Sequence, residues 1–522
     1  MAPSTEQAPR GRPRFETYLF FFTTFFLILL FVHAPFLSMP FFWDEAGQFI
    51  PASLDLYRDG AWIPFSTMPN VHPPGLMAVL AAVWTLAGYS ITATRITMLV
   101  IGAAAVLVSF LLAIRLSRGL DGAPAFAAVW FLLASPLFYT QSMMAQLDMP
   151  AMLFTGLALL FFLHDRFRLA ALACTLLVLT KETGVVVPLV LGAWLLREGR
   201  RSAAALFLAP LLALAAWLSV LALATGSALG NQDFERYNLI YPLHPVRLSL
   251  ALLRRFHYLF LAEFRWIGWI AVAWAWKRTD IFRTRAWRVA AAVACVQVLI
   301  VTVLGGAVLE RYLLPALPVC YAAMAAAGAV FSSRWRIVGQ GALVLGLIAA
   351  NFWTSPVWPG PHENNLAMTR LIDVHRQTAA FLEMHLRPGA RVATAWPLSD
   401  ALRRPELGYV SRPLNVVALE DFERDSIKGL RGKPVDAFVL FSLRREPRWS
   451  LVPDALARHI LRSYYGFEGP LDAEETARIL TLERAASWSH GSEWAEVLLS
   501  QNNHAKRSLR RFERFRATDG HR

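Results

Sequence analysis

Long apolar runs fill the first two thirds of the chain and constrain its fold more than any other feature. They lie near residues 18–37, 95–114, 123–139, 150–163, 168–180, 183–196, 203–225, 256–276, 287–304, 312–331 and 336–353. Several approach the ~20 residues that cross a bilayer as a helix. Only 17% of residues are charged, whereas soluble domains have about 25%. The sequence therefore predicts a polytopic α-helical membrane protein.

Basic residues indicate how these helices are oriented. A twelfth run, "PPGLMAVLAAVWTLAG" at 73–88, is ambiguous. If it lies at the membrane surface and the N-terminus is cytoplasmic, the cytoplasmic loops hold seventeen Lys or Arg and the opposite side holds eight. This bias agrees with the positive-inside rule, and a spanning 73–88 helix would reverse most of it. We therefore expect about eleven spanning helices, and we interpret the net charge of +14 as an orientation signal rather than a nucleic-acid-binding one.

The composition changes after Trp353. Short β-branched runs, "RVATAW" at 391–396, "NVVAL" at 415–419 and "DAFVLFS" at 436–442, alternate with helical patterns such as 366–387. Such alternation is typical of an α/β domain. The sequence predicts a membrane domain over 1–353, with a first external loop at 38–94, and an external α/β domain over 354–522.

Polar clusters at the ends of the apolar runs emerge on one side of the membrane in this topology. They are Asp44 with Glu45, His72, Asp148, Lys181 with Glu182, and Glu310 with Arg311. Five clusters placed at random on alternating faces would rarely share one side. The arrangement predicts a single site on the external face.

Four of these five clusters also have a purely structural explanation. Asp148 precedes Met149-Pro150 and suits a helix N-cap. Lys181 and Glu182 can form a mutual ion pair, which contributes about 0–1 kcal/mol when exposed. Arg311 with its neighbouring tyrosine can serve as an interfacial anchor, and His72 can be incidental to a helix start at the following prolines.

The clusters resemble an ordered set of family motifs. W-D-E at 43–45, H-P-P at 72–74, L-D-M-P at 147–150, L-T-K-E at 179–182 and E-R-Y-L-L-P at 310–315 look like the GT-C class of membrane glycosyltransferases. The protein O-mannosyltransferase-like and lipid A aminoarabinose transferase-like groups are the most similar. The resemblance covers about residues 15–330. It implies transfer of a sugar from a polyprenyl-phosphate donor to a lipid, glycan or protein acceptor on the non-cytoplasmic face.

The resemblance also implies roles for individual residues. By motif position, Asp44 matches the general base and Asp148 the second-loop acid. Lys181 and Tyr312 match family residues of the short turn and of the R-Y-x-L-P segment. Because charge builds on the departing phosphate, the cations Lys181, Arg311 and Arg255 are expected to bind it. His72 can also meet the phosphate, and Glu45 and Glu182 are expected to support the site. The aminoarabinose transferases have Glu-Lys before the two prolines, whereas this chain has Val71-His72. A divalent metal ion therefore stays open as a cofactor.

Two other functional classes are compatible with a polytopic membrane chain. A transporter or lipid flippase usually carries ionisable residues near the bilayer midplane, but here the acids lie at helix ends and the apolar runs hold few charges apart from Glu263 and Arg265. A non-catalytic assembly subunit with the same fold stays open as well. The expected location is the bacterial inner membrane, with the site and the C-terminal domain facing the periplasm.

Overall fold

The computed structural model describes residues 14–353, 362–443 and 452–500. The chain forms two compact units. The first consists of Met1–Ser38 with Ser53–Ala350, and the second of Met39–Ala52 with Asn351–Arg522. The second unit thus includes the beginning of the first predicted loop.

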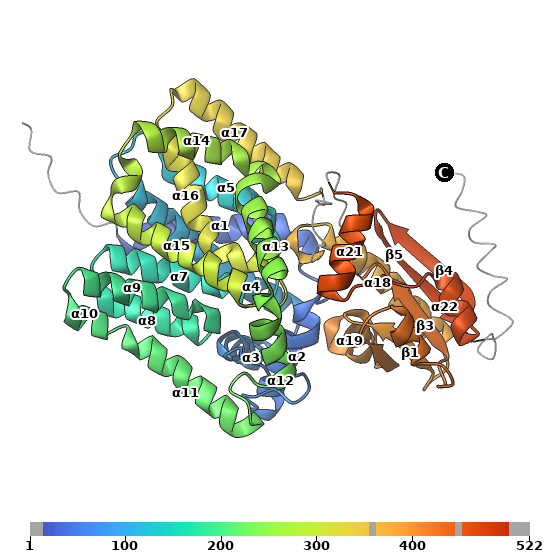
Figure 1. Cartoon of the computed structure of the whole chain (residues 1–522). Helices are drawn as coiled ribbons and strands as arrows, with labels where there is room; N and C mark the ends of the chain where they lie inside the picture. The colour runs from blue at the N-terminus through green and yellow to red at the C-terminus, as the bar shows by residue number, and fades with distance from the viewer. Residues whose placement is uncertain (1–13, 354–361, 444–451, 501–522) are drawn as a thin grey trace, which may run out of the picture. The chain divides into compact units, whose positions relative to one another are not determined.

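Helices account for nearly all regular structure in residues 14–353 (Figure 1). They are α1 (Phe15–His33), α2 (Ile50–Asp59), α3 (Gly75–Ala87), α4 (Ile91–Leu116), α5 (Pro124–Ala134), α6 (Pro136–Met143), α7 (Asp148–Leu163), α8 (Phe167–Val178), α9 (Val186–Arg197), α10 (Arg201–Ala205), α11 (Leu208–Thr225), α12 (Gln232–Glu235), α13 (Pro245–Phe256), α14 (Arg265–Arg278), α15 (Arg285–Val303), α16 (Leu317–Gly328) and α17 (Ser333–Ala350). Short turns η3 (Glu182–Val185) and η9 (Glu310–Ala316) precede α9 and α16.

Five helical segments in the described residues are long and apolar enough to cross a bilayer: Phe15–Phe36, Ile91–Leu116, Arg201–Thr225, Pro245–Arg278 and Arg285–Val303. A sixth is obtained if α5 and α6, which meet at a bend of 68°, count as one span. The apolar helices α3, α7 and α8 are shorter than a full span. These helices support an integral membrane protein, and the expected number of about eleven spans is not confirmed.

Small residues let the central helices approach one another. A Cβ added at Gly156 of α7 would lie 2.8 Å from Cγ1 of Val108 on α4. A Cβ added at Gly268 of α14 would lie 2.6 Å from the Met324 side chain on α16. Small residues at helix interfaces are the usual means of close packing in membranes. The core of this unit therefore lies around α4, α7 and α16. These helices position the segments that contain the candidate site residues.

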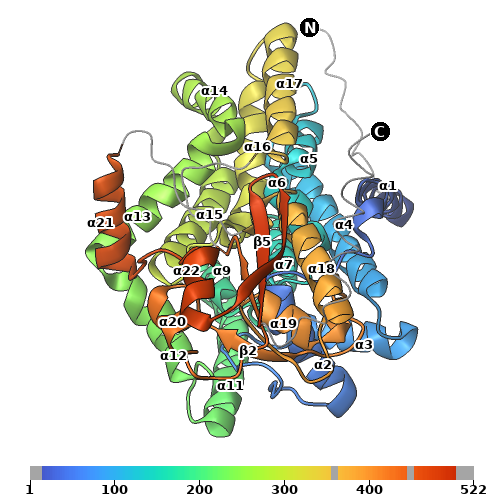
Figure 2. The same cartoon turned by 90° about the vertical axis from the view of Figure 1, so that its right-hand side faces the viewer.

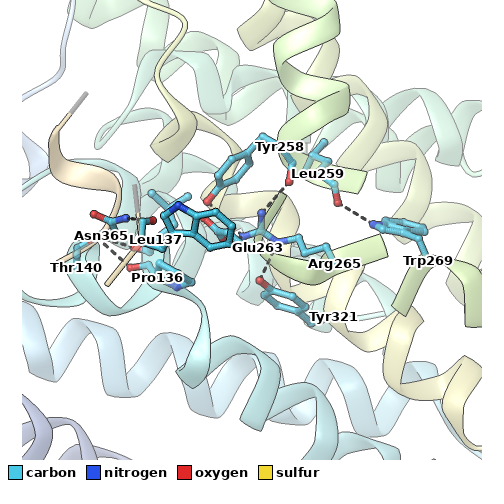
Figure 3. A network of polar contacts seen from close by, with 11 residues as sticks. Pro136, Leu137, Thr140, Tyr258, Leu259, Glu263, Arg265, Trp269, Tyr321 and Asn365 are labelled. Carbon is cyan, nitrogen blue, oxygen red and sulfur yellow. Dashed lines mark hydrogen bonds and ion pairs between the residues drawn. The ribbon is translucent and has the colours of Figure 1, made fainter. Parts of the chain in front are cut away.

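A break divides the 34-residue segment Pro245–Arg278. Glu263 and Phe264 have φ values of +56° and +62°, in the left-handed region that non-glycine residues rarely adopt. Directly after the break, Arg265 donates hydrogen bonds to the backbone oxygen of Tyr258 at 2.7 Å and to the hydroxyl of Tyr321 at 3.1 Å, and it pairs with Glu263 (Figure 3). The charges that the sequence showed inside an apolar run therefore satisfy one another where the helix is interrupted.

The second unit contains a β-sheet (Figure 2). It has five strands in the order β2-β1-β3-β5-β4. The strands are β1 (Arg391–Ala395), β2 (Asn415–Leu419), β3 (Ala437–Phe441), β4 (Glu483–His490) and β5 (Glu493–Leu499). Strand β1 pairs in parallel with β2 and with β3, β5 pairs antiparallel with β3, and β4 pairs antiparallel with β5. All five residues of β3 are buried, as is usual for a central strand flanked on both sides.

Helices surround this sheet, and α18 packs along β4 and β5. The helices of the second unit are α18 (Met368–His385), α19 (Leu398–Arg403), α20 (Arg424–Lys428), α21 (Asp454–Tyr465) and α22 (Ala473–Leu480). The three predicted strands and the predicted helix at 366–387 are confirmed. Strands β4 and β5 were not predicted. Strand β4 is mostly exposed and has no apolar alternation that would have indicated it.

Candidate active site

Three charged residues from distant parts of the sequence form a buried cluster in the first unit. Lys181 pairs with Oδ1 of Asp148, and Nε of Arg311 lies 3.1 Å from Oδ2 of the same carboxylate. Each of the three side chains is at most 6% exposed. One carboxylate thus lies between two cations, and the cluster carries a net positive charge. We call Asp148, Lys181 and Arg311 the ion cluster.

Helix boundaries bring the ion cluster together. Asp148 is the first residue of α7, and Lys181 lies between the end of α8 and the turn η3. Arg311 is the second residue of η9, which packs against α7. The N-cap of α7 is Leu147, so Asp148 is not the N-cap that its position before Met-Pro suggested. Its side chain serves the ion cluster instead.

Tyr312 completes the cluster on one side. The Lys181 ammonium lies 4.2 Å from the centroid of the Tyr312 ring, and the Arg311 guanidinium lies 5.4 Å from it. A cation over an aromatic face is stabilised by the ring's negative quadrupole. Tyr312 therefore helps to hold Lys181 and Arg311 in place, the two cations that the sequence analysis proposed as phosphate-binding residues.

His72 and Glu182 form a second pair in the same unit. Nδ1 of His72 lies 2.8 Å from Oε2 of Glu182, and both side chains are mostly buried. Burial raises the pKa of Glu182, but the charge of His72 and its hydrogen bond outweigh burial and leave this pKa below its ordinary value. The mutual pairing of Lys181 with Glu182 is thus replaced by two longer-range pairs. Lys181 thus pairs with Asp148, and His72 pairs with Glu182.

Arg255 makes backbone contacts near the cluster. Its Nη1 donates to the carbonyl of Leu309 at 2.6 Å, and its Nη2 donates to the carbonyl of Val301 at 3.1 Å. Arg254, which the sequence analysis did not select, forms a bidentate pair with Glu310 at 2.6 and 2.8 Å. Both arginines thereby fasten the segment that leads into Arg311 and Tyr312. Glu310, the partner of Arg254, belongs to the E-R-Y-L-L-P motif, and that motif was the sequence signal that could have led to this pair.

Asp44 and Glu45 lie in the second unit. Glu45 is fully buried, and its Oε2 accepts a hydrogen bond from the backbone nitrogen of Phe42 at 3.1 Å. Asp44, at the start of the π-helical turn η2 (Glu45–Phe49), is half-buried. The backbone nitrogen of Phe41 donates to the carbonyl of Leu407 at 3.0 Å. The acidic pair therefore sits on a turn that the α/β domain holds.

Trp396 contacts the same turn. Its ring lies 4.5 Å from that of Trp43 in an edge-to-face arrangement. A Cβ added at Gly47 would lie only 2.5 Å from Nε1 of Trp396. A glycine is therefore needed there for this close approach, and the C-terminal domain fixes the backbone on which Asp44 is carried.

A narrow, closely packed space lies beside the ion cluster. Its lining includes Asp148, Lys181, Tyr312, Thr155, Thr183 and Gln297. Thr183 and Gln297 were not selected from the sequence, although a glutamine within an apolar helix was a usable signal. Among the described residues, no group of three or more His, Cys, Asp or Glu side chains is arranged to hold a metal ion.

Solved structures of similar fold decide the architectural class. ArnT from Cupriavidus metallidurans bound to undecaprenyl phosphate is 16% identical, over 95% of this chain and 99% of that chain, with a TM-score of 0.54. The chain has the GT-C fold. An oligosaccharyltransferase from Archaeoglobus fulgidus in complex with Zn and sulfate is 13% identical, over 80% of this chain and 67% of that chain, with a TM-score of 0.50. No protein-family model and no curated protein matches the sequence.

Proposed function

We propose that this protein transfers a sugar from a polyprenyl-phosphate carrier to a lipid, glycan or protein acceptor. The ion cluster is the observation that carries the proposal, because it fixes two buried cations around a single carboxylate. The excess positive charge suits a phosphate monoester or diester, which cations bind through charge-assisted hydrogen bonds. ArnT, with which the chain shares its fold, was solved with undecaprenyl phosphate bound.

The cluster suits the departure of the phosphate. An acceptor hydroxyl attacks the anomeric carbon, the bond from that carbon to the phosphate oxygen breaks, and the phosphate keeps the electron pair. Negative charge grows on the phosphate in the transition state, and cations held in place beforehand stabilise it. We assign this stabilisation to Lys181 and Arg311, and to Asp148 the positioning of both cations. The proton of the acceptor hydroxyl goes to Asp44, an assignment that rests on its place in the W-D-E motif.

The proposed orientation follows from the distribution of basic residues. With the N-terminus in the cytoplasm, the loops that carry His72, Lys181 and Arg311 face the outside. We therefore place the reaction on the periplasmic side of a bacterial inner membrane, where a lipid-linked donor needs no nucleotide-binding loop. Membrane lipids surround the first unit.

Carrier binding and turnover test the proposal together. Purified protein in lipid is offered undecaprenyl phosphate, and then a panel of polyprenyl-phosphate sugars with envelope acceptors, with products followed by mass spectrometry. Lys181→Met keeps the side-chain length and removes the charge, and Lys277→Met at an exposed position is its matched control. We expect Lys181→Met to weaken carrier binding and to abolish turnover, and Lys277→Met to match wild type. Equal carrier binding by all three proteins, or none by wild type, would refute the proposal.

A further inference from the structure

Three large apolar side chains lie exposed in the segment that connects α2 to α3. Trp62, Phe65 and Met68 are each between 58 and 67% exposed, and they follow one another closely in the sequence. A single exposed apolar residue needs no explanation, whereas several in one short segment mark a surface that contacts a partner or a membrane. We call residues 61–69, with the sequence A-W-I-P-F-S-T-M-P, the apolar loop.

The apolar loop is held in a defined conformation. Asp55 of α2 is buried, and its Oδ2 accepts hydrogen bonds from the backbone nitrogens of Phe65 and Ser66, both at 2.9 Å. The carbonyl of Pro69 accepts a hydrogen bond from Nδ2 of Asn231 at 2.9 Å. Burying a carboxylate is costly unless it forms such bonds, so Asp55 serves to fix this loop. The fold itself therefore presents the apolar side chains at the surface.

Further hydrogen bonds satisfy the backbone directly after the apolar loop. Nε1 of Trp217 donates to the carbonyl of Val71 at 3.0 Å, and the backbone nitrogen of His72 donates to Oδ1 of Asn70 at 3.0 Å. Non-helical backbone close to lipid requires that protein groups satisfy its polar atoms, because little water is available there. These bonds lower the cost of bringing the loop to the edge of the hydrocarbon region.

The apolar loop also continues a stretch of chain that suits contact with lipid. Residues 60–94 contain no Asp, Glu, Lys or Arg. They include α3, an apolar helix shorter than a full span, on which Leu86 is 89% exposed. The stretch leads directly into α4, which is long and apolar enough to cross a bilayer. An uncharged, partly exposed stretch beside a span fits the membrane interface, where aromatic residues gather.

We propose that the apolar loop inserts the side chains of Trp62, Phe65 and Met68 into the interfacial region of the bilayer. The membrane around the first unit is an apolar phase already present beside α3 and α4, so no further partner is needed to cover these side chains. The two aromatic rings and the thioether bury apolar area there, and the loop carries no charge that would have to leave water. The loop thereby anchors the segment between α2 and α3 at the membrane surface.

The anchor also fixes the depth of His72. This residue follows the apolar loop by three positions and pairs with Glu182, the neighbour of Lys181 in the sequence. Under the proposed function the carrier phosphate lies at the depth of the lipid headgroups, and Lys181 must lie at the same depth to bind it. The loop therefore holds the phosphate-binding residues at headgroup depth. This consequence rests on the proposed function, whereas the insertion of the loop does not.

Fluorescence quenching in nanodiscs measures the depth of the loop. The full-length chain, with its three cysteines replaced by alanine, receives a bimane label on Phe65→Cys, Leu212→Cys or Asp425→Cys. Each nanodisc holds one chain in phosphatidylcholine with or without brominated acyl chains, and iodide is the quencher in water. Leu212, exposed in the middle of the segment Arg201–Thr225, is the lipid reference, and the exposed Asp425 of α20 is the water reference.

We expect brominated lipid to quench the label on Phe65→Cys nearly as strongly as the label on Leu212→Cys. Iodide should quench the label on Asp425→Cys far more strongly than either. Quenching of Phe65→Cys by iodide alone would place the loop in water and overturn the proposal. Protection from both quenchers in single-chain nanodiscs would show that protein covers the loop, and this result would overturn the proposal as well.

Binding of undecaprenyl phosphate tests the consequence for the site. Phe65→Glu introduces a charge that resists insertion, whereas Phe65→Leu keeps an apolar side chain and is its matched control. We expect Phe65→Glu to bind the carrier several-fold more weakly than wild type and Phe65→Leu to bind it equally well, with thermal unfolding confirming that both are folded.

The possible failures are distinguishable. If Phe65→Glu binds the carrier as wild type does, the loop does not set the depth of His72, and that consequence is wrong. If wild type binds no carrier at all, the proposed function fails. The quenching measurement needs no carrier, so it decides in either case whether the loop inserts.

Discussion

The ion cluster and the acidic turn at Asp44 both contain a buried carboxylate, but they satisfy it in different ways. Asp148 receives two cations that lie 33 and 163 positions further along the chain. Glu45 accepts its hydrogen bond from Phe42, three residues away. The first arrangement exists only when three helical segments pack together, whereas the hydrogen bond between Phe42 and Glu45 forms within a single turn.

The ion cluster and the acidic turn thus show two ways in which a protein holds the residues of a site in place. A buried charge without partners is strongly destabilising. The members of the ion cluster therefore hold one another at fixed positions, because each needs a partner of opposite charge. The acidic turn is contacted by Leu407 and Trp396 of the α/β domain, which help to hold it in place. We therefore expect changes in the cluster to affect both folding and transfer, and changes at the turn to affect transfer more than folding.

The largest effect is expected for Asp148→Asn. The substitution leaves Lys181 and Arg311 buried without the carboxylate between them, which costs about 3–5 kcal/mol of unfolding free energy. Sugar transfer should be lost as well. Asp165→Asn is the matched control, because Asp165 pairs with Arg200 at 2.9 Å in an exposed position and such pairs contribute about 0–1 kcal/mol. Thermal unfolding in detergent measures both, and equal stability of the two variants would contradict the comparison.

Asp44→Asn should reduce the rate of sugar transfer strongly and leave the stability of the protein unchanged. Loss of a general base lowers the rate of transfer by roughly 10²–10⁴-fold. The unfolding temperature should stay that of wild type, because Asp44 is half-buried and outside the ion cluster. The exposed Asp59 supplies the control Asp59→Asn, with wild-type rate and stability. Normal turnover by folded Asp44→Asn would remove Asp44 as the base.

Gly47→Ala tests whether the α/β domain positions the acidic turn. The added Cβ would lie 2.5 Å from Nε1 of Trp396, so the ring or the turn must move. We expect a loss of about 1–3 kcal/mol and a reduced transfer rate. At Gly429 of the same unit an added Cβ would make ordinary contacts of 3.4 Å or more, so Gly429→Ala should change neither property. Wild-type transfer by Gly47→Ala would show that Trp396 does not position the turn.

Glu182→Gln should give the smallest effect and one that depends on pH. Since the folded-state pKa of Glu182 lies below 4.5, its ionised form stabilises the protein above pH ~4.5, and that contribution is lost as the pH falls through the lowered pKa. Glutamine still accepts a hydrogen bond from His72, so the cost at neutral pH should be about 1 kcal/mol.

The unfolding temperature measured against pH is the readout for this pair. Once the pH falls below the lowered pKa of Glu182, the curve of Glu182→Gln should approach that of wild type, because both then carry a neutral side chain at position 182. Asp233→Asn at an exposed position should follow wild type at every pH. A constant difference between Glu182→Gln and wild type across the acid range would show that the charge of Glu182 contributes nothing.

Much of the architecture was predictable because it depends on local pattern. Apolar runs indicated the helical membrane unit, and the β-branched runs at 391–396, 415–419 and 436–442 became β1, β2 and β3. Strand β4 escaped prediction because most of its residues are exposed, so burial left no alternation in the sequence. The number of spans was equally hard to predict, since helices such as α7 are shorter than the bilayer is thick.

By itself, the sequence determined that the chain is helical, apolar and supplied with charged residues at helix ends. Only the tertiary structure decided that Lys181 pairs with Asp148 rather than with its neighbour Glu182, and that Gln297 and Thr183 line one closely packed space. The physical reason is that apolar periodicity depends on adjacent residues, whereas the partners of a buried charge depend on which helices exclude water together. Desolvation makes those pairings obligatory, but it acts only once the chain has folded.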